Sequence, residues 1–316
     1  MKNFNLWSIN NPCYNIDDLN DFAQKDAKNL IKNCEKVYND QINEVAKNIR
    51  AKKIKMVLVA GPSSAGKTTT SKILAKKLLS YNIGSIVISM DDFFLDLKDT
   101  PLLEDGNPDF DNVTTVDIKE FQKFYKTLLT QKKAEKPIYN FVKQKRDEWE
   151  TIKLNENSVI IIEGLHALNP IFFNDDSLEK QIYRIYINSH SIFREKDKII
   201  LSPQDLRLIR RIYRDYLTRD KSPKQTLSFW NNVCDAENKF ISPFKHLADY
   251  FIDTTIPYEI LIYAHCFTGF LKGYEDIDKI NDLIKIFEKL TPLSKTSIPE
   301  NSLLWEFIVN KEESYE

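Results

Sequence analysis

The residues of this chain that are best suited to chemistry lie in one short stretch with two glycines. An apolar run at residues 56–60 leads into a segment that fits the pattern G-x-x-x-x-G-K-[ST], namely Gly61, Pro62, Ser63, Ser64, Ala65, Gly66, Lys67 and Thr68. Apolar side chains then recur at helical spacing over residues 71–79. A strand, a glycine loop and a helix in this order are the context in which the pattern binds phosphate.

These residue types match the requirements of phosphate binding. Gly61 and Gly66 allow backbone N–H groups to point inward at phosphate oxygens, and the following helix adds positive charge at its N-terminus. Lys67 would reach the β- and γ-phosphates, and the Thr68 hydroxyl would bind Mg²⁺. A chance match in a stretch rich in Lys and Thr is the alternative. The flanking strand and helix instead favour a nucleotide site that extends to Thr69.

Acidic residues directly follow the next apolar strands. Asp91 and Asp92 come after the strand expected at 85–89, and Glu163 follows the apolar run at 159–162. Open α/β sheets bind ligands at the carboxyl ends of their strands, so Asp91 and Glu163 should lie at the phosphate site. We expect Asp91 to accept a hydroxyl proton or bind Mg²⁺, and Glu163 to hold Mg²⁺ or its water. The alternative for Asp91 is a helix cap or a solvated turn residue, and the alternative for Glu163 is a strand-end cap. The Asp92 side chain should point away from the site.

Several arginines lie on a helix predicted near residues 203–219. Spacings of three, four and seven residues place Arg207, Arg210, Arg211 and Arg214 along one face. Guanidinium groups match phosphate oxygens through paired hydrogen bonds, so the absence of lysine among them favours a role at phosphate. We predict a lid that neutralises the charge on a transferring phosphoryl group, with a solvated helix face as the alternative.

The elements that would position these groups alternate between strands and helices. Strands are predicted at residues 56–60, 85–89, 154–162, 182–187 and 250–252. This alternation, with a phosphate-binding loop after the first strand, predicts an α/β P-loop fold with a doubly wound parallel sheet. Residues 16–49 carry an apolar stripe that we interpret as a helical hairpin packed on the core. Residues 95–116 form an irregular, acidic stretch of the kind that is either functional or disordered.

Composition excludes several classes of protein. The chain has 316 residues and a net charge of −1, so no bulk charge favours nucleic acid or an anionic membrane. No apolar run has the length of a membrane span, and the N-terminus lacks the apolar core of a secretion signal. The cysteines are scattered, which is typical of reduced thiols in a cytoplasmic protein: Cys13, Cys34, Cys234 and Cys266.

Taken in order, the motifs resemble the uridine kinase/phosphoribulokinase family of P-loop kinases. Beyond the glycine loop they are Ser-Met-Asp-Asp-Phe-Phe at 89–94, Pro-Asp-Phe-Asp at 108–111, Tyr-Asn-Phe at 139–141, residues 163–170 and 205–211, and Ile-Pro-Glu-Asn-Ser-Leu-Leu at 298–304. The best match is to bacterial uridine kinase-like nucleoside kinases, which often carry TGS and other threonyl-tRNA-synthetase-like modules ahead of the kinase. This sequence is expected to lack those modules.

The resemblance implies phosphoryl transfer from ATP or GTP, with Mg²⁺, to the 5′-hydroxyl of a nucleoside, first of all uridine or cytidine. It also implies a five-stranded sheet with the strand order of nucleoside monophosphate kinase-like proteins. By motif position the catalytic residues would be Asp91, Lys67, Arg207 and Arg211. The Mg²⁺ ligands would be Thr68, Asp91 and Glu163. Asp111 would hold the ribose hydroxyls, and the other substrate contacts would be Tyr139, Arg146 and Arg207.

The match to the family pattern is incomplete on the acceptor side. Phe94, Asn140 and Gln144 stand where a tyrosine, an aspartate and a histidine are common in the family. Another hydroxyl acceptor therefore stays open, including a sugar phosphate as in phosphoribulokinase, towards which Lys143, Lys145 and Arg146 would supply charge. A nucleotide-binding regulator is a third reading, which an intact set of Lys67, Thr68, Asp91 and Glu163 disfavours.

These inferences divide the chain into three parts. We expect a helical N-terminal extension (1–50), a P-loop kinase domain (51–260) and a helical C-terminal extension (261–316) packed on it. The expected partner is a small-molecule nucleoside, with neither a membrane nor a nucleic acid involved. Because the family includes oligomers, a homo-oligomer joined through the N-terminal helices is a further hypothesis.

Overall fold

The central element is a five-stranded parallel sheet, seen in a computed structural model that describes residues 13–173 and 176–308. Its order is β10-β7-β2-β6-β3, with bounds Tyr250–Asp253, Ile182–Asn188, Met56–Ala60, Val159–Glu163 and Ser85–Ser89. Numbered along the chain these strands run 2-3-1-4-5, so the direction of winding reverses beside β2. The predicted strands and the doubly wound parallel sheet are confirmed.

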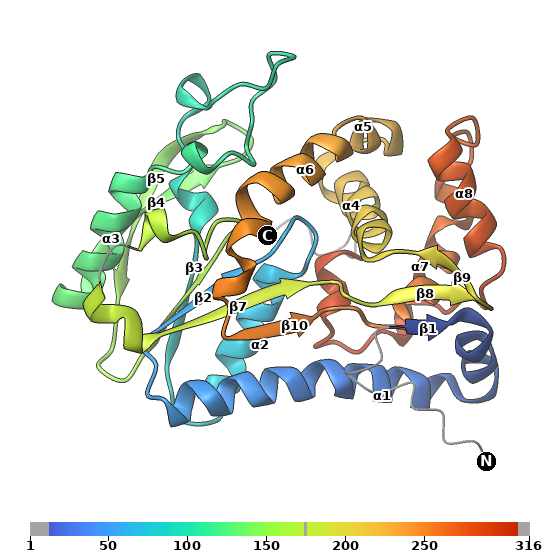
Figure 1. Ribbon diagram of the computed structural model, residues 1–316, viewed down its shortest axis with the longest axis horizontal. Helices are drawn as coiled ribbons and strands as arrows, with labels where there is room; N and C mark the ends of the chain where they lie inside the picture. Colours follow the sequence, from blue (N-terminus) through green and yellow to red (C-terminus); the bar gives the residue numbers. More distant parts are fainter. Residues whose placement is uncertain (1–12, 174–175, 309–316) are drawn as a thin grey trace.

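Both faces of the sheet are covered, because the strand residues alternate between two hydrophobic clusters. Val57 and Val59 of β2 face a cluster with α1, α2, α4 and α7, whereas Met56 and Leu58 face a cluster with α3 (Figure 1). These helices span Ile16–Ala51, Lys67–Leu79, Pro203–Arg219, Glu259–Phe270 and Ile118–Gln131. Such burial on both faces explains why the strands read as unbroken apolar runs.

The N-terminal segment, where the stripe predicts a helical hairpin, is helical on both sides of a break at Asp26. Helix α1 runs along one side of the molecule (Figure 1), and at Asp26 its backbone has the non-helical angles φ −158° and ψ 74°. The Asp26 carboxylate accepts the N–H of Asn29 at 3.1 Å, and the part of α1 before the break is hydrogen-bonded to the C-terminal region, from Asn20 to Lys289 and from Gln24 to Thr291. The stripe stays on one face, where Leu30, Cys34, Tyr38 and Ile42 are buried.

Three further groups of elements surround this core. Strands β4 and β5 form an antiparallel hairpin (Lys133–Asn140 and Lys145–Lys153). A small sheet joins β1, β8 and β9 (Cys13–Asn15, Ile192–Glu195 and Lys198–Leu201). Helices α5, α6 and α8 span Pro223–Ser228, Trp230–Ala236 and Asp278–Phe287. No helix in residues 13–173 and 176–308 is long and apolar enough to cross a membrane.

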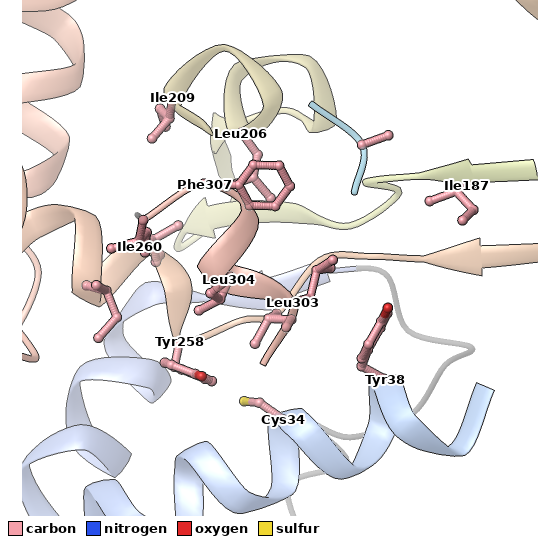
Figure 2. Close-up of a cluster of buried hydrophobic side chains, with 14 of the residues drawn as sticks. Cys34, Tyr38, Ile187, Leu206, Ile209, Tyr258, Ile260, Leu303, Leu304 and Phe307 are labelled. Atoms are coloured by element: carbon pink, nitrogen blue, oxygen red, sulfur yellow. The ribbon is translucent and has the colours of Figure 1, made fainter. Parts of the chain in front are cut away.

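The last described segment, residues 298–308, which we call the C-terminal strap, returns to the centre of the molecule. Its Leu303, Leu304 and Phe307 are fully buried among side chains of α1, α4 and the start of α7 (Figure 2). The Ser302 hydroxyl donates to Glu35 Oε1, which also accepts a 2.6 Å hydrogen bond from the Tyr258 hydroxyl. The strap therefore ties three helices together beside the glycine loop.

A fully buried ion pair fixes α4 against α7. The guanidinium of Arg210 donates to both carboxylate oxygens of Glu259, at 2.8 and 2.7 Å, and to the Thr254 carbonyl at 2.7 Å. Neither side chain of the pair is exposed, and the Phe307 ring lies 4.4 Å from the guanidinium carbon. The Arg210 guanidinium is thus bound inside the protein. It is not available to bind phosphate, the role predicted for this row of arginines.

Removing one partner of this pair should destabilise the fold strongly. Glu259→Ala would leave the Arg210 guanidinium buried without a counter-charge, and we expect a loss of about 3–5 kcal/mol in the free energy of unfolding, measured by urea denaturation. The matched control is Glu179→Ala, because Glu179 is 61% exposed in its ion pair with Arg184 and should contribute less than about 1 kcal/mol. Equal losses for the two variants would contradict the structural role of Arg210.

Candidate active site

The glycine loop connects β2 to α2 and is closely packed at both of its glycines. A Cβ atom at Gly61 would lie 2.0 Å from the carbonyl oxygen of Ile187 in the neighbouring strand β7. Gly66 has φ +90°, which disfavours other residues, and a Cβ there would meet Leu303 of the strap at 2.8 Å. The loop can therefore curl around a phosphate only because these positions are glycine. Within it, Lys67 Nζ donates to the Pro62 carbonyl at 3.1 Å.

The structure brings Lys67, Asp91 and Glu163 together at the carboxyl edge of the sheet. Burial raises the pKa of Glu163 to about 7, and the negative charge of Asp91 adds to this shift. Burial also raises the pKa of Asp91, while the Lys67 ammonium opposes that increase. The pKa of Lys67 is lowered by burial, against the attraction of Glu163 and Asp91. Each group therefore lies within electrostatic reach of the other two, as the strand-end positions predicted.

The oxygen atoms gathered here suit a hard cation. Thr68 donates its hydroxyl to Glu163 Oε1 at 3.1 Å, and the carboxyls of buried Glu163 and half-buried Asp91 lie within electrostatic reach of each other. Hydroxyl and carboxylate oxygens are the ligands that Mg²⁺ prefers, usually one or two of them together with phosphate. Within the described ranges no three His, Cys, Asp or Glu side chains cluster as metal ligands. The Thr68 hydroxyl and the carboxylates of Asp91 and Glu163 are nevertheless oxygen donors of the kind that fit Mg²⁺.

Asp92 lies on the opposite side of the backbone from Asp91, as predicted. Its carboxylate forms an ion pair with the buried ammonium of Lys136 in β4, which also pairs with Glu150 in β5 at 2.9 Å. Asp92 therefore attaches the β4–β5 hairpin to the sheet and takes no part in the phosphate site.

Three arginines of α4 reach the glycine loop, in different ways. Arg211 Nη1 donates to the Ser63 hydroxyl at 2.9 Å, and Arg207 Nη1 donates to the Ser63 carbonyl at 3.3 Å. Arg207 is also bound to Glu237 at 2.6 Å and is only 4% exposed in its side chain, compared with 14% for Arg211. Arg210 completes the set by donating to the Ser64 carbonyl at 3.4 Å. Arg211 is therefore the guanidinium of these three that is freest to turn towards a ligand.

Aromatic rings pack around a second group of predicted residues. Tyr139 is buried, and its ring packs edge-on against Phe94 and Phe141, with centroids 5.6 and 5.1 Å away. Phe94 also stacks on Phe110 at 6.0 Å. Burial raises the pKa of Asp111, next to Phe110, and the positive charges of Arg211 and Lys67 partly offset the increase. Asp111 thus lies between the aromatic group and the cations of the phosphate site.

The irregular stretch 95–116 is ordered by turns and by contacts with its neighbours. Leu95 donates its N–H to the Thr115 carbonyl at 2.8 Å, and the Thr115 hydroxyl donates to the Asp109 carbonyl at 2.7 Å. Arg146, predicted to contact substrate, pairs with Asp117 at 3.1 Å and donates its N–H to Asp96. These contacts attach the hairpin to the loop and do not bring Arg146 to Lys67 or Asp91.

One side chain at the site was missed by the sequence reasoning. Glu306 of the strap accepts a 2.9 Å hydrogen bond from the backbone N–H of Thr69, in the first turn of α2. Its negative charge affects the pKa of Lys67, Glu163 and Arg214. The two partners are 237 residues apart, and no local pattern predicts such a contact.

These observations define the class of protein: a P-loop fold whose glycine loop, lysine and strand-end carboxylates form a phosphate site. The family model described as phosphoribulokinase/uridine kinase matches residues 56–259, which is most of the chain. The protein belongs to the phosphoribulokinase/uridine kinase family, and the predicted family resemblance is confirmed.

Individual relatives and solved structures show what the chain is similar to. A uridine kinase of Ligilactobacillus salivarius is 29% identical over 201 residues, covering 63% of this chain and 85% of the relative. A uridine kinase of Bacillus subtilis is 27% identical over 195 residues, covering 61% and 83%. Among solved structures, a possible uridine kinase from Bacillus stearothermophilus aligns with a TM-score of 0.46 at 19% identity, over 68% of this chain and 98% of that one.

His166, close behind Glu163 in the sequence, should make stability depend on pH. Its ring lies between Phe172 and Phe240, and burial lowers its pKa to about 4, from an ordinary value of 6.5. The folded state therefore resists protonation of His166. The stability that depends on the neutral ring is complete above pH 6.5 and is lost as the pH falls towards 4. We expect a loss of about 2 kcal/mol between pH 7 and pH 5.

Thermal unfolding at several pH values tests this expectation. His166→Gln should reduce the decline in melting temperature between pH 7 and pH 5, whereas the same change at the exposed His265 should leave it as in the parent protein. An unchanged decline in His166→Gln would show that other groups govern the acid sensitivity.

Proposed function

We propose that this protein transfers the γ-phosphoryl group of ATP, or of GTP, to the 5′-hydroxyl of a nucleoside, with uridine and cytidine as the first candidates. The observation that carries the proposal is the grouping of Lys67, Asp91 and Glu163 below the glycine loop, with Asp111 on the far side. Curated relatives named uridine kinase support the nucleoside as acceptor.

Each group has a separate task in this proposal. Asp91 accepts the proton of the acceptor hydroxyl as its oxygen attacks the γ-phosphorus, and the bond to the β-phosphate oxygen breaks. Lys67 and Arg211 stabilise the charge that develops on the phosphoryl oxygens. Thr68 and Glu163 would hold Mg²⁺, which neutralises charge on the phosphates when it is bound. The raised pKa of Asp91, a consequence of burial, makes its carboxylate a better proton acceptor.

The acceptor would lie between Asp111 and the aromatic group. A carboxylate beside a ring-lined wall suits a nucleoside, because its ribose offers paired hydroxyls and its base offers a flat face. Tyr139 and Phe110 would form part of that wall, while Asp111 would accept hydrogen bonds from the ribose hydroxyls. Asn140 instead accepts hydrogen bonds from the backbone of Val142 and Lys143, and so stabilises the tip of the hairpin.

A different hydroxyl acceptor is the second candidate. One observation argues against an acceptor that carries a phosphate. The lysines that would bind a sugar phosphate, Lys143 and Lys145, are both paired with Asp147 on the exposed hairpin. Arg146 is paired with Asp117. These cations are therefore engaged within the hairpin and its base rather than directed at the Lys67 site, so an acceptor without a phosphate fits the site better.

Substrate screening tests the proposal directly. The purified protein, incubated with Mg²⁺, ATP and single acceptors, should release ADP with uridine or cytidine and form a product heavier by one phosphoryl group. Ribulose 5-phosphate and simple alcohols serve as the competing acceptors. Turnover of ribulose 5-phosphate or a simple alcohol alone would replace the nucleoside assignment. Tight ATP binding without any turnover would favour a nucleotide-binding regulatory protein.

Substitution of Asp91 separates its role from general damage to the site. Asp91→Asn should reduce kcat by about 10²–10⁴-fold with little change in ATP affinity, because the amide cannot accept the proton. Asp92→Asn is the matched control, since Asp92 faces Lys136 and should lower stability more than kcat. A kcat near that of the parent protein in Asp91→Asn would exclude Asp91 as the base.

The arginines of α4 should differ in their effects. Arg211→Ala should reduce kcat/KM by on the order of 10²-fold without unfolding the protein, because the contacts of Arg211 with Ser63 and Asp215 are less buried than the Arg207–Glu237 pair. Arg207→Ala should also lower the melting temperature, because it breaks a buried pair with Glu237. Steady-state kinetics with melting curves of both variants provide the test. Unchanged kcat/KM in Arg211→Ala would mean that this guanidinium stabilises the conformation of the glycine loop and does not act on the substrates.

A further inference from the structure

The C-terminal strap places a carboxylate where the phosphate site of a kinase offers its backbone donors. Thr69 follows Lys67 and Thr68 in the first turn of α2, where N–H groups have no partner within the helix. In the structure the Thr69 N–H is bound to Glu306 Oε2 at 2.9 Å. Backbone N–H groups in this position, together with the helix dipole, are what a P-loop uses to bind phosphate oxygens.

Helix α2 has no acidic residue of its own near its N-terminus. Its capping residue is Gly66, which has no side chain, and its first turn contains no acidic residue. Glu306 therefore provides from a distant segment the anion that the helix N-terminus favours. The same carboxylate lies within electrostatic reach of Lys67 and Arg214, two cations that would otherwise attract phosphate.

The strap is anchored by buried residues on both sides of Glu306, whereas Glu306 itself is only half-buried. Leu303 and Phe307, on either side of Glu306, are fully buried, and Leu303 packs directly on the loop glycine Gly66. Ser302 is tied to Glu35. Glu306 itself is only partly buried. A change of side-chain rotamer can therefore release the Thr69 N–H while the backbone of the strap stays in place.

We propose that Glu306 is a donor-site residue whose carboxylate stands in for a phosphate of the nucleotide on the Thr69 N–H, and that the bound nucleotide must displace it. This inference rests on the proposed function, because it requires that the glycine loop binds a nucleoside triphosphate. Two anions cannot share one donor, and like charges at this separation repel. Glu306 thus lowers the affinity for the donor and stabilises the site when no donor is present.

A purely structural cap and a competing anion predict opposite effects on nucleotide binding. If Glu306 only caps α2, its removal should leave ATP affinity unchanged or weaken it by loosening the loop. If it competes, its removal should tighten ATP binding, although the nucleotide-free protein becomes less stable. Lower stability together with higher affinity is therefore the combined result that identifies competition.

The test is calorimetric titration of Mg²⁺ and ATP into the full-length protein without an acceptor. Glu306→Gln keeps an oxygen for the Thr69 N–H but removes the charge, and Glu306→Ala removes both. Each should lower the Kd for ATP by on the order of tenfold. Glu300→Gln, an exposed glutamate of the same strap, should leave the Kd unchanged. Inorganic triphosphate should show the same gain, because the competition concerns phosphate and not the base.

The contradicting outcomes are distinct. Parent and Glu306 variants that bind ATP equally, or variants that bind it more weakly, would overturn the competition and leave the kinase proposal intact. A gain with ATP but not with triphosphate would also overturn it, by placing Glu306 beside the nucleoside part of the donor. Folded parent and Glu306 variants that bind no ATP at all would overturn both the proposed function and this inference.

Discussion

The interaction on which the rest of the site depends is the confinement of Lys67 between Asp91 and Glu163 at the carboxyl edge of the sheet. Burial alone would push the carboxyls towards their neutral forms and Lys67 towards its uncharged form. The Lys67 ammonium opposes these shifts at both carboxyls, and a hydrogen bond with Ser89 also lowers the pKa of Glu163. Under the proposed function, the metal that accompanies the nucleotide would add positive charge beside the two carboxyls.

Around this centre the protein uses one helix for two purposes. Arg210 of α4 is buried against Glu259 and sets the position of the helix, which allows Arg211 to meet the glycine loop at Ser63. In the strap, the Phe307 ring packs on the Arg210 guanidinium and Leu303 packs on Gly66. Stability and phosphate binding are therefore coupled through α4. A substitution in the strap should also change the conformation of the glycine loop.

What could be predicted from the sequence depended on local patterns. The five central strands are apolar runs, and the rule that carboxyl ends of parallel strands share an edge correctly grouped Lys67, Asp91 and Glu163. Strand β5 was missed because its sequence, Lys-Arg-Asp-Glu-Trp-Glu-Thr-Ile-Lys, has little apolar character and belongs to an exposed hairpin. Glu306 was missed because its contact with Thr69 depends on how the C-terminal segment folds back, which no spacing encodes.

The central claim is that one site holds a triphosphate and a nucleoside with Asp91 between them. A crystal structure with Mg²⁺, a non-hydrolysable ATP analogue and uridine tests it most directly. The account predicts triphosphate in the glycine loop, ribose hydroxyls on Asp111, and the 5′-hydroxyl within hydrogen-bond distance of Asp91 and in line with the γ-phosphorus. A nucleoside bound away from Asp91, or an analogue bound outside the loop 61–69, would contradict it.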